Sequence, residues 1–208
     1  NKVRYTLSNA NSIVAVSNSY LEWGLKKALR KKSKLDKIYY LGYRSHQKNY
    51  KVNNILMPSW INQSSSKKII TFIGSFGFSY ELDLVLRVAQ KLSARNDICF
   101  VLAGAGEQFT KIKREAEKID NVLIPGWLGK NEILVLLQNS CIGLLPYVKG
   151  APQSVPNKPI EYFSSGLPII SSLSGEMAEL IETYRLGINY NPGDINGLYS
   201  AIIALVDN

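Results

Sequence analysis

Residues 153–175 read QSVPNKPIEYFSSGLPIISSLSG and predict a loop, a short helix, a strand and a second loop. Asn157 is a candidate N-cap, and Pro159 is acceptable in the first turn of the helix. Gly166 supplies a left-handed stop at the end of the helix. The apolar run 167–172 is typical of a buried strand.

The start of this helix is a candidate anion site. Its first backbone N–H groups have no partner within the helix, and Lys158 adds a positive charge in the first turn. Glu161 places a carboxylate one turn further on. A phosphate joined to a polyol would satisfy both groups. A solvated lysine and a structural helix carboxylate are the plainer readings of these two residues.

Strands alternate with helices on both sides of this stretch. This alternation predicts an α/β, Rossmann-like parallel sheet with helices on both faces and ligands at the carboxyl ends of the strands. Gly74, Gly104 and Gly126 follow three of the strands, and three glycines at one edge favour a nucleotide crevice over simple turns. The expected strands are 69–73, 98–103, 122–124, 142–145 and 187–190, and the expected helices are 80–93, 108–118, 131–137 (capped by Asn131), 176–184 and 195–206 (capped from Asp194).

The first part of the chain is less regular. After a short mixed segment, residues 12–16 predict a buried strand and residues 38–41 a second one. Ser19 and Glu22 have the spacing of a capping box that opens a helix between these strands. The polar residues 43–66 predict a linker.

Charge separates the two parts. Residues 1–68 hold 14 Lys and Arg against 2 Asp and Glu, a balance of +12, whereas residues 69–208 hold 11 against 14, a balance of −3. The basic part fits anionic lipid, nucleic acid, a partner protein or merely a solvated helix face. The acidic balance of the remainder argues against nucleic acid. Cys99 and Cys141 have the spacing of neither a metal site nor a disulfide framework.

Several sites of known chemistry are disfavoured. Residues 104–107 (GAGE) begin like a dinucleotide fingerprint, but Phe109 stands at the third glycine. Residues 74–77 (GSFG) lack the Gly-Lys-Ser/Thr of a P-loop. Glu81 and Asp83 fit first-turn dipole partners better than metal ligands. No nucleophile elbow and no Cys–His pair is evident.

Taken together, these segments resemble the C-terminal donor-binding domain of GT-B glycosyltransferases, specifically the large retaining family four. The matching pieces stand in family order: FIGSFG (72–77), VLAGAGE (101–107), NVLIPGWL (121–128), LLPY (144–147) and SVPNKPIEYFSSGLPIISS (154–172). SIVAVSNS (12–19) resembles the end of the acceptor-side domain. The resemblance implies one half of a GT-B fold, with residues 67–208 as the donor-binding domain and residues 1–66 as a remnant of the acceptor-side domain plus linker.

The resemblance also implies roles for matched positions. Glu161 would hold the ribose hydroxyls, and Gln153 stands where the family has a glutamate that contacts the donor sugar. The Arg and Lys-Gly that follow the family's first glycine loop are missing. The other implied donor-binding residues are Gly74, Ser75 and Phe76 in that loop, Gly104, Gly126, Trp127 and Leu128 at the next strand ends, Pro156, Asn157 and Lys158 at the phosphate turn, and Gly175 and Glu176 at the sugar-side loop.

The function implied is transfer of a sugar from a nucleotide-sugar, expected to be UDP-linked, to a saccharide or lipid-linked acceptor, with retained configuration and without metal or other cofactor. Surface polysaccharide biosynthesis is the expected process. A stand-alone nucleotide-sugar binding module with a separate acceptor-domain partner is the alternative. A cytoplasmic location is expected, with peripheral contact at the inner membrane face through basic residues 26–37 and no nucleic-acid partner.

Overall fold

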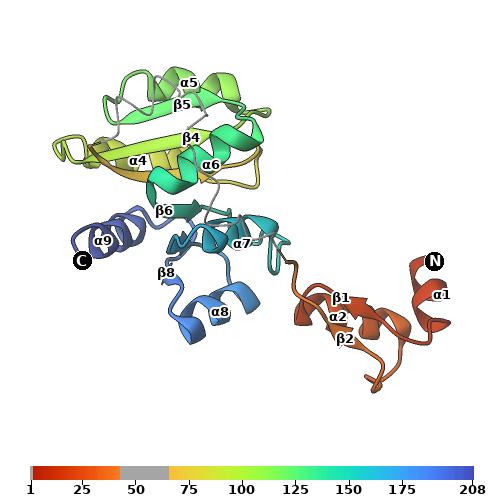
Figure 1. Cartoon of the computed structure of the whole chain (residues 1–208). Coiled ribbons are helices and arrows are strands. Elements are labelled where there is room, and N and C mark those ends of the chain that lie inside the picture. Colours follow the sequence, from red (N-terminus) through yellow and green to blue (C-terminus); the bar gives the residue numbers. More distant parts are fainter. Residues whose placement is uncertain (1, 43–65) are drawn as a thin grey trace.

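The structure is a computed structural model that describes residues 2–42 and 66–208. We call residues 2–42 the front region and residues 66–208 the sheet region. The front region contains α1 (Lys2–Ser8), β1 (Val14–Ala15), α2 (Asn18–Ala28) and β2 (Lys37–Ile38). β1 and β2 form a two-stranded parallel sheet that lies apart from the main sheet (Figure 1).

The sheet region has six strands in the order β5-β4-β3-β6-β7-β8, and every pair is parallel. Because each crossover between parallel strands is right-handed, the reversal of strand order at β3 and β6 puts helices on both faces. α4 packs beside α5 and α9, while α6 and α7 pack on β3 and β6. The strands are β3 (Lys68–Ile73), β4 (Ile98–Ala103), β5 (Val122–Gly126), β6 (Ser140–Leu145), β7 (Ile169–Ser171) and β8 (Gly187–Asn189), and the helices are α4 (Leu82–Lys91), α5 (Phe109–Ala116), α6 (Lys130–Asn139), α7 (Asn157–Ser164), α8 (Glu176–Tyr184) and α9 (Ile195–Val206).

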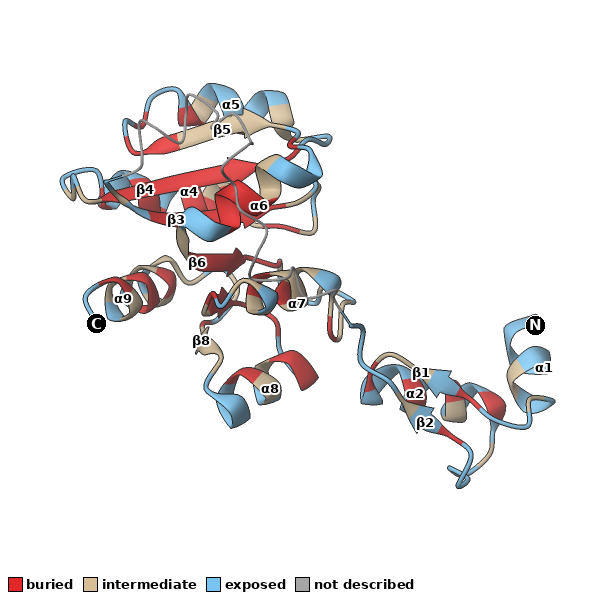
Figure 2. Ribbon diagram, in the orientation of Figure 1, coloured by how far each residue is buried: buried red, intermediate tan, exposed pale blue. Residues whose placement is uncertain are grey.

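The core of the sheet region is continuous, and Figure 2 shows the central strands in the colour of buried residues. All six residues of β4 are buried, as expected for a strand covered on both faces. The front region has a separate small cluster, in which Ile13, Leu21 and Ala28 are the buried members. The two regions therefore fold around different centres.

Most predicted elements of the sheet region are confirmed. In the front region the predicted buried strand 12–16 is only Val14–Ala15, with Val14 exposed, and the predicted strand 38–41 is only Lys37–Ile38. The strand 98–103 and the helices 176–184 and 195–206 have the predicted bounds, and the Asp194 side chain accepts a hydrogen bond from the Gly197 amide at 2.9 Å. Gly166 has the left-handed conformation expected of a helix stop (φ +76°). The predicted linker 43–66 falls, apart from residue 66, outside the described residues.

Three predicted caps are wrong. α2 is capped by Ser17, whose hydroxyl accepts from the Tyr20 amide at 3.2 Å, because Ser19 is engaged in a tertiary contact described below. α7 is preceded by Pro156 in extended backbone, so Asn157 is already the first helical residue. α6 starts after Gly129, whose amide donates to the Glu132 carboxylate at 2.7 Å, instead of at Asn131. In addition, residues 2–8 form a helix that the sequence does not predict, because none of them is buried and no apolar face marks it.

Candidate functional site

Helix α7 is anchored to the sheet by Tyr162. This side chain is fully buried, and its hydroxyl accepts a hydrogen bond from the Ile73 amide at the end of β3, at 3.0 Å. Its ring lies against Gly143 of β6, where a Cβ would be 2.4 Å from the ring. With Tyr162 facing the sheet, Lys158 and Glu161 face the carboxyl edge of the strands.

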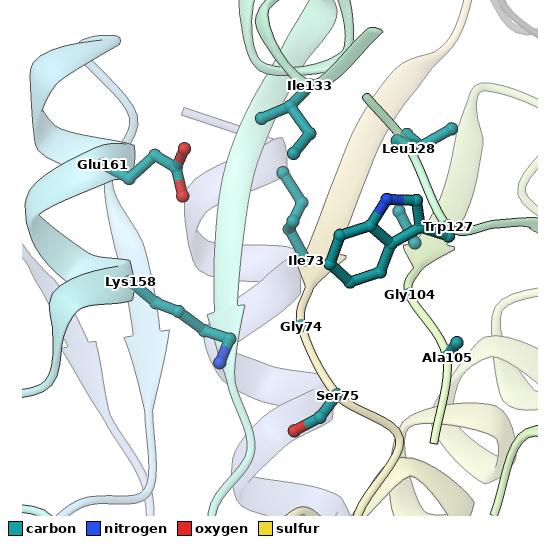
Figure 3. A pocket seen from close by; sticks show the side chains of 11 residues that line it. Ile73, Gly74, Ser75, Gly104, Ala105, Trp127, Leu128, Ile133, Lys158 and Glu161 are labelled. Atoms are coloured by element: carbon teal, nitrogen blue, oxygen red, sulfur yellow. The ribbon is translucent and has the colours of Figure 1, made fainter. Parts of the chain in front are cut away.

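A cavity of about 310 Å³ lies at this edge, between α7 and the ends of β3, β4 and β5. Lys158 and Glu161 project into it from α7, and Trp127 faces them from the opposite wall (Figure 3). Apolar side chains and the backbone of the glycine-rich loops form much of the remainder. The lining residues are Ile73, Gly74, Ser75, Ala103, Gly104, Ala105, Trp127, Leu128, Ile133, Lys158 and Glu161.

Glycine at two strand ends lets the backbones approach closely. Gly104 has φ +148°, and a Cβ placed on it would lie 1.7 Å from the carbonyl oxygen of Gly74. A larger residue at Gly104 would therefore push apart the ends of β3 and β4. Gly74 and Gly104 therefore meet at one edge of the sheet and form the floor of the cavity, whereas Gly126, the third predicted glycine, is not among the lining residues.

The walls of the cavity combine one cation, one carboxylate and one exposed aromatic ring. Among the described lining residues, Lys158 alone is basic, and its Nζ donates to the Tyr80 hydroxyl at 2.7 Å. Trp127 is 80% exposed, whereas the neighbouring Leu128 is buried. An exposed indole beside a cation and a carboxylate is suited to a ligand with a flat ring, an anionic group and hydroxyls.

Seven of the predicted site residues meet at this cavity: Gly74, Ser75, Gly104, Trp127, Leu128, Lys158 and Glu161. Others are placed elsewhere. The Phe76 side chain is fully buried in the core, and Gly126, Pro156 and Asn157 are not among the lining residues. Sequence reasoning missed Ile73, Ala103, Ala105 and Ile133. Ile73 and Ala103 end strands, Ala105 is in the loop after β4, and Ile133 is on α6. An apolar side chain at such positions carries no signal that separates a lining residue from a core residue.

Gln153 lies in the loop before α7. Its Oε1 is buried and has no hydrogen-bond partner among the described residues. Gln153 is not among the residues that line the cavity, so the structure does not bring this predicted sugar contact into it. A buried amide oxygen without a donor is costly, and this one is still open to a hydrogen bond.

Gly175 and Glu176 line a second, polar cavity of about 560 Å³ between α8 and the front region. The Glu176 carboxylate accepts from the amides of Asn18 and Ser19 at 2.9 and 3.0 Å. It also accepts from the hydroxyls of Ser19, Tyr40 and Ser154, at 3.2, 2.7 and 3.0 Å. Glu176 therefore ties the start of α2 to the sheet region instead of lining the first cavity.

These contacts shift two pKa values. Burial raises the pKa of Glu176, but the hydrogen bonds from Asn18, Ser19, Tyr40 and Ser154 outweigh it, so this pKa lies below its ordinary value. The hydrogen bond to Glu176, together with burial, raises the pKa of Tyr40 to about 12. Both groups therefore hold their ordinary charge states at neutral pH, and the contact persists there.

Residues 2–42 and 66–208 contain no group of three or more His, Cys, Asp or Glu side chains arranged to hold a metal ion. In the same described ranges, no helix has the length and apolar character needed to cross a bilayer.

Solved structures with the same fold include a protein described as a glycosyltransferase and two proteins solved with UDP. HepE from Anabaena, solved with UDP and glucose, superposes with a TM-score of 0.71 at 15% identity, covering 99% of this chain and 57% of HepE. A mutant of TarM from S. aureus, solved with UDP, fondaparinux and α-GlcNAc-glycerol, superposes with a TM-score of 0.68 at 17% identity. The match covers 99% of this chain and 39% of TarM. A glycosyltransferase from Rickettsia africae superposes with a TM-score of 0.75 at 15% identity, and the match covers 100% of this chain and 57% of that protein.

At these identities the likeness establishes the fold, a Rossmann-like half of a GT-B architecture. The chain spans between 39% and 57% of the length of these three solved proteins. No curated protein matches the sequence. Residues 67–208 match the family described as glycosyl transferases group 1, and since this match spans more than half of the chain, the chain belongs to that family.

Proposed function

We propose that this chain carries the donor half of a nucleotide-sugar-dependent glycosyltransferase. Residues 67–208 would be the donor-binding domain, and residues 1–66 part of an acceptor-side domain with its linker. The observation that carries the proposal is the placement of Lys158 and Glu161 on the side of α7 that faces a glycine-floored cavity, in a chain of this family. The separate centres of the front and sheet regions support the division into two domains.

The chemistry of the cavity suits a sugar joined to a nucleoside diphosphate. In the transfer, the bond between the anomeric carbon and the diphosphate oxygen breaks, and its electron pair stays on that oxygen. Lys158 and the first amides of α7 would stabilise the departing diphosphate. The acceptor hydroxyl oxygen bonds to the anomeric carbon, and its proton passes to the departing diphosphate oxygen. We assign no enzyme nucleophile and no metal, and we expect the configuration to be retained.

The base would lie across the cavity from the phosphates, with the ribose between them. The Glu161 carboxylate can accept hydrogen bonds from two ribose hydroxyls, and the Trp127 indole offers a face on which a base can stack. The unpartnered Oε1 of Gln153 is the acceptor we assign to a hydroxyl of the donor sugar. UDP is the proposed nucleotide because HepE and TarM were solved with it.

Calorimetric titration of the chain with UDP tests this site. We expect weak, millimolar binding, because the chain spans about half the length of its solved relatives. Glu161→Ala should abolish measurable binding, whereas Glu179→Ala, at an exposed carboxylate on α8, should not. Absence of binding by the unaltered chain at millimolar UDP, or equal binding by Glu161→Ala, would overturn the assignment. A thermal-shift panel of nucleotide-sugars would then identify the donor.

The front region fits a partner with negative charge. On α2, Trp23 is exposed about one turn before Lys26 and Lys27, and beyond the helix Leu29 and Leu35 are exposed among further lysines. Basic side chains interleaved with exposed indole and leucine are typical of contact with an anionic membrane surface. We propose this contact for residues 26–37, with a lipid-linked saccharide of a surface polysaccharide as the acceptor and the cytoplasmic side of the membrane as the location.

Vesicle flotation tests the membrane contact. The chain should float with vesicles containing phosphatidylglycerol and not with pure phosphatidylcholine, and high salt should release it. Changing Lys26 and Lys27 to Gln should weaken flotation, whereas the same change at Lys113 and Lys118 of the sheet region should not. Equal flotation with both lipids would contradict the proposal.

A further inference from the structure

Tyr80 lies at the end of the loop that follows β3, and the site described above gives it no role. It is buried, yet its hydroxyl reaches the ammonium of Lys158 at 2.7 Å. The same ammonium lies 4.8 Å from the centre of the Tyr80 ring and 5.9 Å from that of Phe72. The only described cation of the cavity is therefore held on an aromatic surface, by a hydrogen bond and by cation–π attraction.

Tyr80 is itself held firmly. Because its oxygen accepts from Lys158, its proton is available to Tyr147, and the two hydroxyl oxygens are 3.2 Å apart. The ring centroids of Tyr80 and Tyr147 lie 4.7 Å apart, and Tyr80 meets Phe72 edge-on at 5.0 Å. A backbone bridge also joins residues 80 and 147. Since the ring is fixed from several sides, it can fix a flexible lysine in turn.

The held lysine crosses the loop at Gly74. A Cβ on Gly74 would lie 2.2 Å from Cε and 2.7 Å from Nζ of Lys158. The ammonium therefore rests over the glycine at the end of β3, directly at the floor of the cavity. One of its three protons is used by Tyr80, which leaves others for an anion in the cavity.

We propose that Tyr80 is a positioning residue, which aims Lys158 at the phosphates of the nucleotide-sugar, with Gly74 leaving the space that this pose requires. The inference rests on the proposed donor site. A free lysine side chain loses considerable rotamer entropy when it is fixed by a ligand. Prior fixation by Tyr80 removes part of that cost from binding, so Tyr80 contributes to affinity without touching the nucleotide.

Comparison of UDP with uridine separates positioning from a general structural role, because uridine has no phosphate. By calorimetry, Tyr80→Phe should weaken UDP binding about fivefold to tenfold, as expected for loss of one hydrogen bond to a charged group. Lys158→Met should weaken it more, and the double variant should bind no more weakly than Lys158→Met. Gly74→Ala should reproduce the loss, since it displaces Lys158. Uridine binding should be the same in all four variants.

Tyr199→Phe, at a half-buried tyrosine on α9, is the matched control and should leave both ligands unchanged. Unaltered UDP binding by Tyr80→Phe would overturn the positioning role, and so would an equal loss for UDP and uridine. Additive losses in the double variant would also contradict it. Failure of the unaltered chain to bind UDP is a different result, which would overturn the donor site and this inference together.

Discussion

The sheet region buries a continuous apolar core on both faces of six strands, whereas the front region buries three apolar side chains beside two short strands. A two-stranded sheet with so small a core has little hydrophobic stabilisation of its own. In the front region, polar contacts supply stabilisation that the small apolar core does not. The buried Asp36 carboxylate accepts from Arg30 in a bidentate pair at 2.7 Å, from the Ile13 amide at 2.7 Å and from the Ser33 amide at 2.6 Å.

The comparison shows that the two regions depend on different physical terms. Apolar area holds the sheet region, so its stability is spread over many side chains. In the front region, one carboxylate joins the strand β1, the end of α2 and the turn before β2. A second carboxylate, Glu176 of the sheet region, also stabilises the front region, because it accepts hydrogen bonds from the amides of Asn18 and Ser19. A change at either carboxylate should therefore affect the front region selectively.

The largest expected effect is that of Asp36→Asn. The amide of Asn keeps one acceptor oxygen but points N–H groups at Arg30 or at the Ser33 amide, which are donors themselves. We expect loss of amide protection throughout residues 13–38 in hydrogen exchange, with the sheet region unchanged. Asp97→Asn is the control, since Asp97 pairs with Arg95 at the surface. A protected front region in Asp36→Asn would contradict the comparison.

The same carboxylate predicts a dependence on pH. The hydrogen bond from Arg30 is the largest cause that holds the pKa of Asp36 well below its usual range, and the backbone amides of Ser33 and Ile13 contribute in the same direction. A depressed pKa contributes stability that is complete above the unfolded-state pKa of about 3.9 and is lost as the pH falls below it. Protection of the front region should therefore be constant from pH 7 to about 5 and decline below about 4, and Asp36→Asn should remove this decline.

Phe100→Ala should destabilise the sheet region, which depends on its apolar core. Phe100 is fully buried in β4, at the centre of the sheet. Truncation of such a ring leaves a cavity and costs about 4 kcal/mol. Urea unfolding followed by circular dichroism should show this loss, while Phe78→Ala, at a ring that is 74% exposed, should cost little. Similar losses for the two variants would show that the sheet region does not depend on its core as described.

Much of the fold could be predicted from the sequence because burial leaves a pattern. β4 is an unbroken apolar run, and α9 has both a cap and an apolar face. α1 has no buried residue, so nothing in its sequence distinguishes it from a coil. The sequence does not settle the cap of α2, because Ser17 and Ser19 both suit the role; in the structure Ser17 caps the helix and Ser19 contacts the distant Glu176.

The candidate site could be predicted in part for the same reason. Lys158 and Glu161 are one turn apart on a helix with recognisable ends, so local pattern predicts that they share a face. Tyr80 is separated from Lys158 by 78 positions, and Glu176 from Asn18 by 158. Contacts of such range leave no periodicity, and the tertiary structure alone reveals them.

Glu176→Gln should have a smaller effect, which is confined to the contact between the front region and the sheet region. Gln keeps one acceptor but presents an NH₂ group to the amides and hydroxyls that now donate to the carboxylate. Loss of hydrogen bonds to a charged acceptor costs about 2 kcal/mol. Exchange at the amides of Asn18 and Ser19 should therefore be faster by about 30-fold. Glu179→Gln, one turn later on α8 and exposed, should change neither amide. Unchanged exchange in Glu176→Gln would show that the two regions are not joined here.

The smallest expected effect is that of Tyr162→Phe, which keeps the buried ring against Gly143 and removes one hydrogen bond. The Ile73 amide loses its acceptor at the end of β3, which costs about 1 kcal/mol. The loss should appear in urea unfolding of the sheet region and leave the front region untouched, because the ring still anchors α7 and α8 is not involved. Tyr184→Phe, at an exposed tyrosine, should be neutral. A loss comparable with that of Phe100→Ala would mean that polar anchoring matters in the sheet region as much as apolar burial, and the contrast between the two regions would fail.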